Sequence, residues 1–380
     1  MSTSCSKLRD IVARLRLARV EGVGPIAFRR MLHRYHSAAA ALEALPALLR
    51  SGGRTSAPDI PTQTQAEDEL ARLNRIGACL LVVDEVGYPP LLSLLEDAPP
   101  VLAVLGDPAV LARSAVALVG ARNASANGQR FAERLAAELA HGLVVVSGLA
   151  RGIDAAAHQG AMSAGRTVAV VAGGLDIPYP AEHADLQRRI AENGAVVAEA
   201  PLGTAPQARH FPRRNRIIAG LSLGVVVVEA ALRSGSLITT RIAQDLGREV
   251  FAVPGSPLDP RSHGSNDLIR QGAVLTESAA DVLAHLPDLP AHSLFSHPQH
   301  STAGLAEAPP EPLEPPADMT NVKTQVIDLL SPSPTAVDEL VRRCQFSASA
   351  VMAALLELEL AGRVQALPGN RVALLARKAH

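Results

Sequence analysis

Four glycine-containing loops carry the residues of this chain that are best suited to bind an anion. Backbone N–H groups approach an anion closely at glycine, and the N-terminus of a following helix adds partial positive charge. The loops span residues 120–125, 147–154, 173–176 and 234–240, and each follows a short apolar run or its immediate continuation. The repetition predicts a phosphate cradle that includes Gly120, Ser125, Ser147, Gly148 and Gly174.

The loops do not match the best-known nucleotide motifs. No G-x-x-x-x-G-K-[ST] sequence occurs, and no G-x-G-x-x-G sequence follows the first strand of the pattern, which weakens a nicotinamide interpretation. A single loop of this kind is also what a tight turn requires. It is the occurrence of four loops at successive strand ends that favours anion binding.

A basic patch surrounds Phe211, in a stretch that has no acidic residue between Glu199 and Glu229. Arginines beside a ring that can stack on an unpaired base are typical of single-strand binding, where the cations contact phosphates. The patch consists of Arg209, His210, Arg213, Arg214 and Arg216. Two alternatives stay open, because the patch can also be a solvated face anchored by Phe211, and Asn215 can also cap a helix.

Other polar residues give weaker indications. Asp154, Asp176 and Glu229 follow apolar runs and suit acid–base chemistry, but they can equally bind arginines or cap helices. Ser147 and Ser234 lack the G-x-S-x-G context of a hydrolase nucleophile. The three cysteines form no CxxC pair, and the histidines show no metal-ligand spacing. We therefore expect no catalytic residue, no metal and no cofactor.

The elements that position these residues follow from the apolar runs. Runs without polar alternation are typical of strands that are covered by helices on both faces. They occupy residues 79–83, 116–119, 143–146, 168–171, 195–198, 225–228 and 250–253. Helical spacing lies between them, for example at 128–141 and 237–246. This alternation predicts an α/β fold with a doubly wound, mostly parallel sheet, in which ligands bind beyond the carboxyl ends of the strands.

The flanking regions differ in pattern. Residues 8–49 predict two short helices around a turn from Gly22 to Pro25, and a Gly/Pro/Ser/Thr-rich loop leads to a helix at 65–75. Residues 287–319 are proline-rich and predict a linker. Three further helices, at 322–330, 335–343 and 347–360, precede a hairpin at 363–374, which is a winged-helix outline. We therefore expect domains at 1–75, 76–286 and 320–380, joined by the 287–319 linker.

Composition limits the class of protein. The chain has 380 residues, 48% of them hydrophobic, and a net charge of −1, so a polyanion must be bound by a local patch. The cysteine pattern and the absence of an apolar leader predict a cytoplasmic protein that neither is exported nor spans a membrane.

Several long motifs, in one order, resemble those of one bacterial family. They are SGLARGID at 147–154, GLDIPYP at 174–180, FPRRNRIIAGLS at 211–222, SGSLIT at 234–239 and REVFAVPG at 248–255. They resemble the DNA-processing protein A (DprA/Smf) family, and the resemblance covers residues 8–286 and, more loosely, the C-terminal region. The turn from Gly22 to Pro25 resembles a helix-hairpin-helix or SAM-like element, and the resemblance implies a Rossmann-like central domain.

The resemblance also implies a function. Members of this family bind and protect single-stranded DNA during natural transformation, in competent cells, and help to load the RecA recombinase past single-strand-binding protein. They have no established catalytic activity or metal, and they form homodimers. By position, Arg122 resembles the family's pocket arginine, and Phe211 with residues 213–216 resembles its DNA-contacting loop. The resemblance implies that the remaining rim of this DNA pocket consists of Gly148, Arg151, Gly235, Ser236 and Thr239.

Two other classes of function remain open at this point. A nucleotide-processing enzyme of the phosphoribohydrolase type would use the same strand-end pocket, with Asp176 or Glu229 as its acid or base. The size of the 209–216 patch and the lack of a Pro-Gly-Gly-x-Gly-Thr signature argue against it. A protein-interaction scaffold with a vestigial pocket would bind no oligonucleotide.

Overall fold

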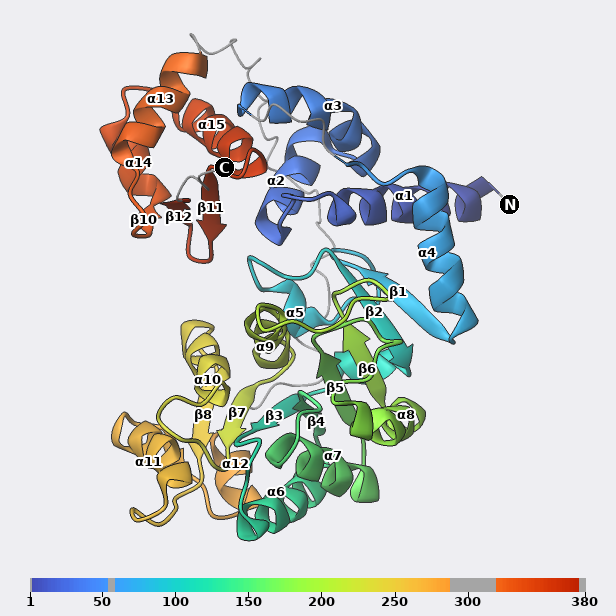
Figure 1. The fold of residues 1–380 in the computed structure, drawn as a ribbon, viewed down its shortest axis with the longest axis vertical. Coiled ribbons are helices and arrows are strands. Elements are labelled where there is room, and N and C mark those ends of the chain that lie inside the picture. The colour runs from blue at the N-terminus through green and yellow to red at the C-terminus, as the bar shows by residue number, and fades with distance from the viewer. Residues whose placement is uncertain (1, 54–58, 288–318, 376–380) are drawn as a thin grey trace, which may run out of the picture. The chain divides into compact units, whose positions relative to one another are not determined.

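The structure of the chain is a computed structural model that describes residues 2–53, 59–287 and 319–375 (Figure 1). The chain divides into two compact units. The first consists of Met1–Glu67, Glu96–Pro100 and His297–His380, and the second of Asp68–Leu95 and Val101–Ser296. Every residue predicted for the phosphate cradle and the basic patch lies in the second unit.

Within the described residues, the second unit is built on a nine-stranded sheet of order β1-β2-β6-β5-β4-β3-β7-β8-β9. The strands are β1 (Ala78–Val82), β2 (Val101–Gly106), β3 (Ala115–Val119), β4 (Val144–Ser147), β5 (Thr167–Val171), β6 (Ala195–Ala198), β7 (Gly224–Val227), β8 (Glu249–Ala252) and β9 (Val274–Leu275). From β6 to β9 the neighbouring strands are parallel, whereas β1 and β2 pair antiparallel at the other edge. The predicted α/β fold with a mostly parallel sheet is confirmed.

The seven apolar runs predicted as strands all form strands, and β2 and β9 are additions to the prediction. β2 leads to β3 through only a short 3-10 turn, η1 (Pro108–Ala112), so the strand–helix alternation does not reveal it. β9 is too short to give a pattern. The helices of this unit are α4 (Gln63–Arg75, in part), α5 (Pro90–Ser93), α6 (Ala126–Leu139), α7 (Ile153–Ala164), α8 (Ala184–Asn193), α9 (His210–Gly220), α10 (Ser236–Asp245), α11 (His263–Arg270) and α12 (Ala279–His285), with 3-10 turns η2 (Ala181–His183) and η3 (Pro260–Ser262).

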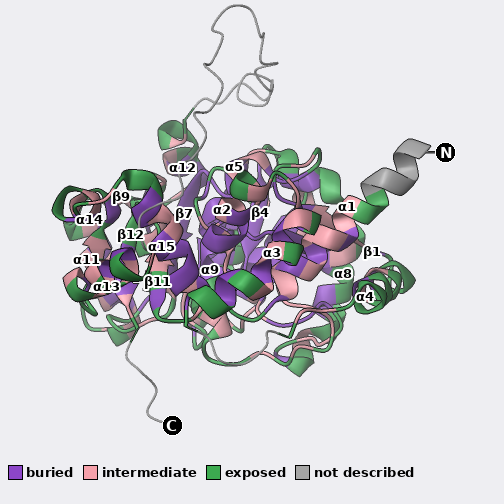
Figure 2. Cartoon of the chain, turned by 90° about the horizontal axis from the view of Figure 1, so that it is seen from above, coloured by how far each residue is buried: buried purple, intermediate pink, exposed green. Residues whose placement is uncertain are grey.

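Both faces of the sheet are covered, as the uninterrupted apolar runs predict. Successive strand residues point to opposite faces, yet Val145 is 0% exposed and its neighbour Val146 is 1% exposed. Figure 2 shows the same burial along β4 and β7, which are drawn in purple. One cluster of buried residues joins Leu135 and Leu139 of α6 to Val145 and to Phe251 of β8.

The order of the strands places a switch point at β3. The chain passes from β3 to β4, β5 and β6 on one side and then returns to β7 on the other side of β3. The connection from β6 to β7 contains α9. In sheets of this kind the crevice for ligands lies at the carboxyl ends of the strands where the order reverses.

The first unit begins with helices α1 (Ser2–Arg19), α2 (Pro25–Tyr35) and α3 (Ala38–Ser51). The prediction of two helices over 8–49 is therefore wrong by one. The break between α2 and α3 consists of two residues only: His36 adopts a left-handed conformation with φ 59°, and Ser37 caps α3 by accepting the N–H of Ala40. Because this break is so short, the helical spacing of apolar residues continues across it. The predicted turn is present, with Gly22 at φ 93° and Pro25 as the first residue of α2.

The C-terminal part of the first unit is a winged helix, as predicted. It consists of α13 (Met319–Leu329), β10 (Thr335–Ala336), α14 (Val337–Arg343), α15 (Ala348–Leu360), β11 (Val364–Leu367) and β12 (Arg371–Leu374), with sheet order β10-β12-β11. The hairpin turns at Gly369 and Asn370, which both have positive φ. The predicted linker lies outside the described residues except at its ends. The helices of the described ranges include none with the length and apolarity that crossing a bilayer requires.

Candidate nucleic-acid interface

Helix α9 connects the loops at the carboxyl ends of three adjacent strands. Its Arg214 donates a hydrogen bond from Nη2 to the carbonyl oxygen of Gly148, after β4, at 3.0 Å. The Nδ2 of Asn215 donates to the carbonyl of Gly235, after β7, at 3.4 Å. Its Phe211 lies against Arg122, from the loop after β3. These contacts bring together three of the four predicted glycine loops and the predicted patch.

An aromatic and cationic cluster forms around Phe211. The guanidinium carbon of Arg122 lies 5.0 Å from the centroid of the Phe211 ring, and that of Arg214 lies 6.0 Å from it. The ring of Tyr179 lies 5.7 Å away, centroid to centroid, with the ring planes inclined by 57°. Arg122 is exposed and Tyr179 is 48% exposed, so a cation and a ring that both contact Phe211 face solvent. This combination can bind a phosphate and stack on a base.

Arg214 is the buried member of the cluster, and its guanidinium packs against Gly148. A Cβ atom at Gly148 would overlap the Arg214 guanidinium, so this approach requires glycine. Burial lowers the pKa of Arg214 to about 10, with Asp154 opposing the shift, and the side chain stays cationic at neutral pH. Asp154 accepts the N–H groups of Gly148 and Ala150 at 3.2 and 3.3 Å, and burial raises its pKa against the effect of Arg214. Arg214 and Asp154 thus fix the loop after β4.

The other predicted arginines separate into exposed and paired side chains. Arg209 and Arg213 are exposed on the first turn of α9 or just before it. Arg216 is buried and forms an ion pair with Glu199, with 2.5 Å between Nη2 and Oε1. Arg151 is exposed but forms a bidentate pair with Glu182 at 2.5 and 2.7 Å. The predicted arginines that face solvent are therefore Arg122, Arg209 and Arg213, together with Arg151 in its pair with Glu182.

His210, at the start of α9, has a lowered pKa. It is lowered first by burial and then by the charges of Arg209 and Arg213. The direction of the shift keeps His210 neutral at neutral pH. The smaller, electrostatic part of this shift comes from Arg209 and Arg213, whose positive charges favour an anion at the start of α9.

The carboxylates considered for acid–base chemistry are engaged with the backbone. Glu229 accepts the N–H of Ser125 at 2.8 Å and its hydroxyl at 2.5 Å, and Ser125 in turn caps α6 by accepting the N–H of Gly128 at 2.9 Å. Asp176 accepts the N–H of Gly203 at 2.8 and 3.0 Å. Both groups thus hold loops in place.

Several predicted residues lie beneath the surface of the crevice. Ser147 is fully buried and donates its hydroxyl to the carbonyl of Leu118 at 2.6 Å. Thr239 is buried, and the hydroxyls of Ser234 and Ser236 bond each other at 2.6 Å. The backbone N–H of Gly174 donates a hydrogen bond to the carbonyl oxygen of Thr204 within the protein. These residues shape the loops from which Arg122 and the start of α10 project, and Gly120 packs directly on the Ile153 side chain.

Tyr179 is the residue of the cluster that the residue patterns alone do not select. The signal was present in the sequence, because Tyr179 is one of nine aromatic residues and belongs to the 174–180 motif. Its contact with Phe211 joins two loops that are distant in sequence, and only the fold reveals it.

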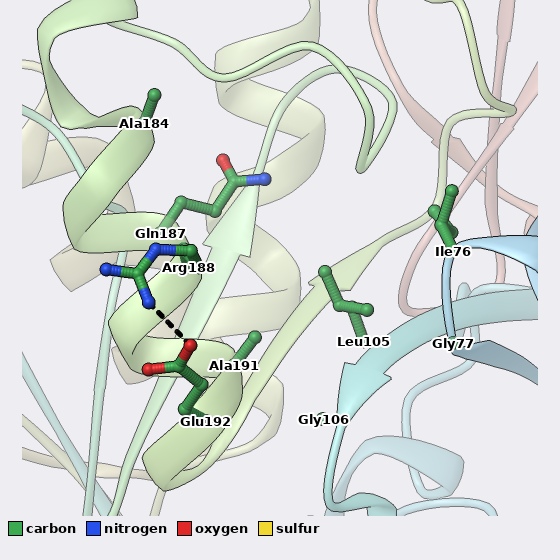
Figure 3. Close-up of a pocket in the computed structure, with 9 residues that line it drawn as sticks. All are labelled: Ile76, Gly77, Leu105, Gly106, Ala184, Gln187, Arg188, Ala191 and Glu192. Atoms are coloured by element: carbon green, nitrogen blue, oxygen red, sulfur yellow. Dashed lines mark hydrogen bonds and ion pairs between the residues drawn. The ribbon is translucent and has the colours of Figure 1, made fainter.

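A separate hollow of about 450 Å³ lies beside α8, at the edge of the sheet that β1 and β2 form (Figure 3). It is lined by Ile76, Gly77, Leu105, Gly106, Ala184, Gln187, Arg188, Ala191 and Glu192, none of which belongs to the predicted site. In the described parts of the chain, no group of three His, Cys, Asp or Glu side chains gathers as a metal ion would need.

Comparison with known proteins gives consistent matches. The family model for DNA recombination-mediator protein A matches residues 79–287. Models for a DprA-like N-terminal HHH domain and a DprA winged helix domain match residues 9–71 and 307–370.

Individual relatives cover most of the chain. Protein Smf of Escherichia coli (strain K12) is 41% identical over 318 residues, which are 81% of this chain and 80% of that protein. The DNA processing protein DprA of Streptococcus pneumoniae is 48% identical over 198 residues, 52% of this chain and 70% of that protein. Among solved structures, DNA processing protein A from Streptococcus pneumoniae superposes with a TM-score of 0.61 at 34% identity, covering 72% of this chain and 96% of that one.

Proposed function

Since the chain belongs to the DNA recombination-mediator protein A family, we propose that it binds single-stranded DNA in the crevice at the carboxyl ends of β3, β4 and β7. The contact that carries this proposal is the one between Phe211 and Arg122, 5.0 Å apart, with Tyr179 beside them. It places a guanidinium and two rings at the switch point of the sheet, where ligands of such folds bind.

The proposed recognition divides between backbone and base. Arg122, Arg209 and Arg213 bind phosphates, which carries no sequence information and gives affinity that falls with salt. Tyr179 and Phe211 stack on an unpaired base, which is tolerant of sequence because every base has a π-face. A base paired within a duplex does not present that face, so the pair of rings favours single strands.

The site acts by holding DNA and not by transforming it. Glu229 and Asp176 are each committed to backbone N–H groups, and Asp154 is buried under Arg214. Each of these carboxylates thus has a role in holding a loop that needs no acid–base chemistry. We therefore retain the non-enzymatic interpretation over the nucleotide-processing one.

The wider role we propose is that of a cytoplasmic recombination mediator. A homodimer would cover the incoming strand during natural transformation and load RecA on it in the presence of single-strand-binding protein. A strand-exchange assay with RecA and single-strand-binding protein, with and without this chain, tests that role. Faster exchange with the chain supports it, and unchanged exchange contradicts it.

Binding itself is tested by fluorescence anisotropy with dye-labelled oligo(dT) and a duplex of the same length. We expect the full chain to bind the single strand more tightly than the duplex. The matched variants are Arg122→Ala and Arg130→Ala, since Arg130 is exposed on α6 outside the cluster. Loss of affinity in the first and not in the second supports the site, and equal effects would place the DNA elsewhere.

A further inference from the structure

Helix α15 is buried on two opposite sides. Val351, Ala354, Leu355 and Leu358 face the core of the winged helix and belong to its cluster of buried residues. At about 100° per residue, Leu356 and Leu360 lie on the other side of the helix. They are outside that cluster, yet they are only 3% and 1% exposed.

The second buried side is the one that a DNA-reading winged helix keeps open. In such domains the recognition helix packs on its own core with one face and presents the opposite face to a DNA groove. In α15 the opposite face carries Leu356 and Leu360 with Glu357, which is 7% exposed, and the helix has no lysine or arginine. Both the burial and the charge are wrong for contact with phosphates.

The N-terminal helices of the same unit cover this face. Helix α15 lies against α2 and α3. Gly52, directly after α3, comes so close that a Cβ atom there would overlap the carbonyl oxygen of Glu357 and lie 2.9 Å from the Cβ of Ala361. This close packing is possible because residue 52 has no side chain.

Two cations fasten the contact. The Nζ of Lys323, on α13, donates to the carbonyl oxygen of Ser51 at 2.5 Å and to Oε2 of Glu357 at 3.0 Å. The Nη1 of Arg30, on α2, lies 3.5 Å from Oε2 of Glu359 without a hydrogen bond between these two atoms, and the two side chains are 17% and 11% exposed. Burial raises the pKa of Glu359 to about 7 against the effect of Arg30, so this second contact is weaker than that of Lys323. Ion pairs that are removed from water in this way are costly to break by removing one partner.

We propose that this face of α15 is the docking surface for the N-terminal helical domain, so that the winged helix clamps α2 and α3 and does not read duplex DNA. The winged helix and the N-terminal helices then behave as one module although residues 68–296 separate their main parts in sequence. This inference does not depend on the proposed binding of single strands.

The test is hydrogen exchange of the full chain, followed by mass spectrometry of peptides within residues 354–361. Gly52→Val forces the two surfaces apart, and we expect exchange in these peptides to rise about tenfold because the helix opens locally once its second face is uncovered. The control is Gly142→Val, since a Cβ at Gly142 meets nothing within 4 Å. Equal exchange in wild type and Gly52→Val would overturn the proposal.

A second variant separates undocking from loss of the N-terminal fold. Arg30→Met removes the cation that pairs with Glu359 and keeps an apolar stem on α2. If Gly52→Val also speeds exchange in peptides of α1, the N-terminal fold itself is disturbed and the result for Arg30→Met decides. Faster exchange at 354–361 in Arg30→Met, with α1 still protected, supports docking. In a further arm, a duplex added to wild type leaves exchange at 354–361 unchanged. Protection of these peptides by the duplex would show that α15 reads DNA.

Discussion

At the scale of single residues, the basic patch contains two kinds of arginine that the sequence does not distinguish. Arg213 and Arg214 are neighbours of the same type, but Arg213 faces solvent while Arg214 is buried against Gly148. Arg216 is committed to Glu199. The exposed members suit phosphate binding, and the buried members hold α9 at the strand ends. Their substitutions therefore have different expected effects.

Arg213→Ala removes an exposed charge and leaves the packing intact. We expect weaker binding of single strands, by a similar factor for all sequences, and an unchanged Tm, because a phosphate contact is lost without a buried partner being left behind. Arg216→Ala removes the ion pair with Glu199, in which the two side chains are 11% and 27% exposed, so we expect a lower Tm. Anisotropy and thermal unfolding of both variants check this pair of outcomes. Equal Tm values for the two variants would contradict it.

Phe211 and Tyr179 are expected to contribute through stacking. Phe211→Ala should weaken binding of oligo(dT) by about 1–3 kcal/mol, and Tyr179→Leu by a similar or smaller amount, because each removes a ring that an unpaired base can cover. Phe346→Leu, in the winged helix, is the control for the loss of a ring elsewhere. The measurement is the Kd at fixed salt. Full affinity in Phe211→Ala would remove the ring from the site.

His158 is a buried titratable residue whose protonation opposes folding. Its Nδ1 lies 2.7 Å from the hydroxyl of Thr167, which donates its own proton to the carbonyl of Val145, so Nδ1 carries the histidine proton. Burial, aided by the charges of Arg214 and His183, lowers the pKa of His158 from 6.5 to about 3.

The sign of the resulting pH dependence follows from that depressed pKa. Between about pH 6.5 and pH 3 the unfolded chain binds a proton at His158 and the folded chain does not, so stability falls with decreasing pH by up to about 1.4 kcal/mol per unit. His158→Leu should flatten this dependence between pH 6.5 and pH 5. Urea unfolding at several pH values measures it, and the same slope in both proteins would rule out His158 as its source.

At the scale of secondary-structure elements, the approach of α9 to the loop after β4 sets the site. Gly148→Ala places a methyl group where the Arg214 guanidinium lies. We expect Arg214 to be displaced, α9 to shift and the affinity for single strands to fall at least several-fold, because Phe211 moves with the helix. Gly142→Ala, which has open space, is the control. Unchanged affinity in Gly148→Ala would show that α9 does not depend on this contact.

The elements were predictable where one period dominates the sequence. Runs such as Val168–Val171 and Val225–Val228 have no polar alternation, and each coincides with a strand to within a residue. The break between α2 and α3 was missed because it consists of His36 and Ser37 alone. β2 was missed because it pairs antiparallel with β1 and β6 and no long helix links it to β3. In these cases a local turn or a distant pairing, and not periodicity, decides the structure.

At the scale of the whole molecule, the sequence supplies the components of the site and the fold supplies their assembly. The glycine loops and the Arg–Phe patch are visible as motifs, and the resemblance to the DprA/Smf family is confirmed. The contact of Tyr179 with Phe211 and the burial of Arg214 depend on loops from different strands meeting at one edge. Likewise, the lack of lysine and arginine on α15 is explained only once the fold shows that α2 and α3 cover this helix.

The salt dependence of single-strand affinity tests the central claim most directly. At roughly −0.7 per phosphate contact, about four contacts predict a slope of log K against log salt near −3, and the double variant Arg122→Ala/Arg213→Ala, which leaves about two contacts, should lower its magnitude to about 1.4. Anisotropy titrations of oligo(dT) at several salt concentrations give both slopes. An affinity that is absent even in dilute buffer, or a slope that the double variant leaves unchanged, would contradict binding of DNA phosphates at the ends of β3, β4 and β7.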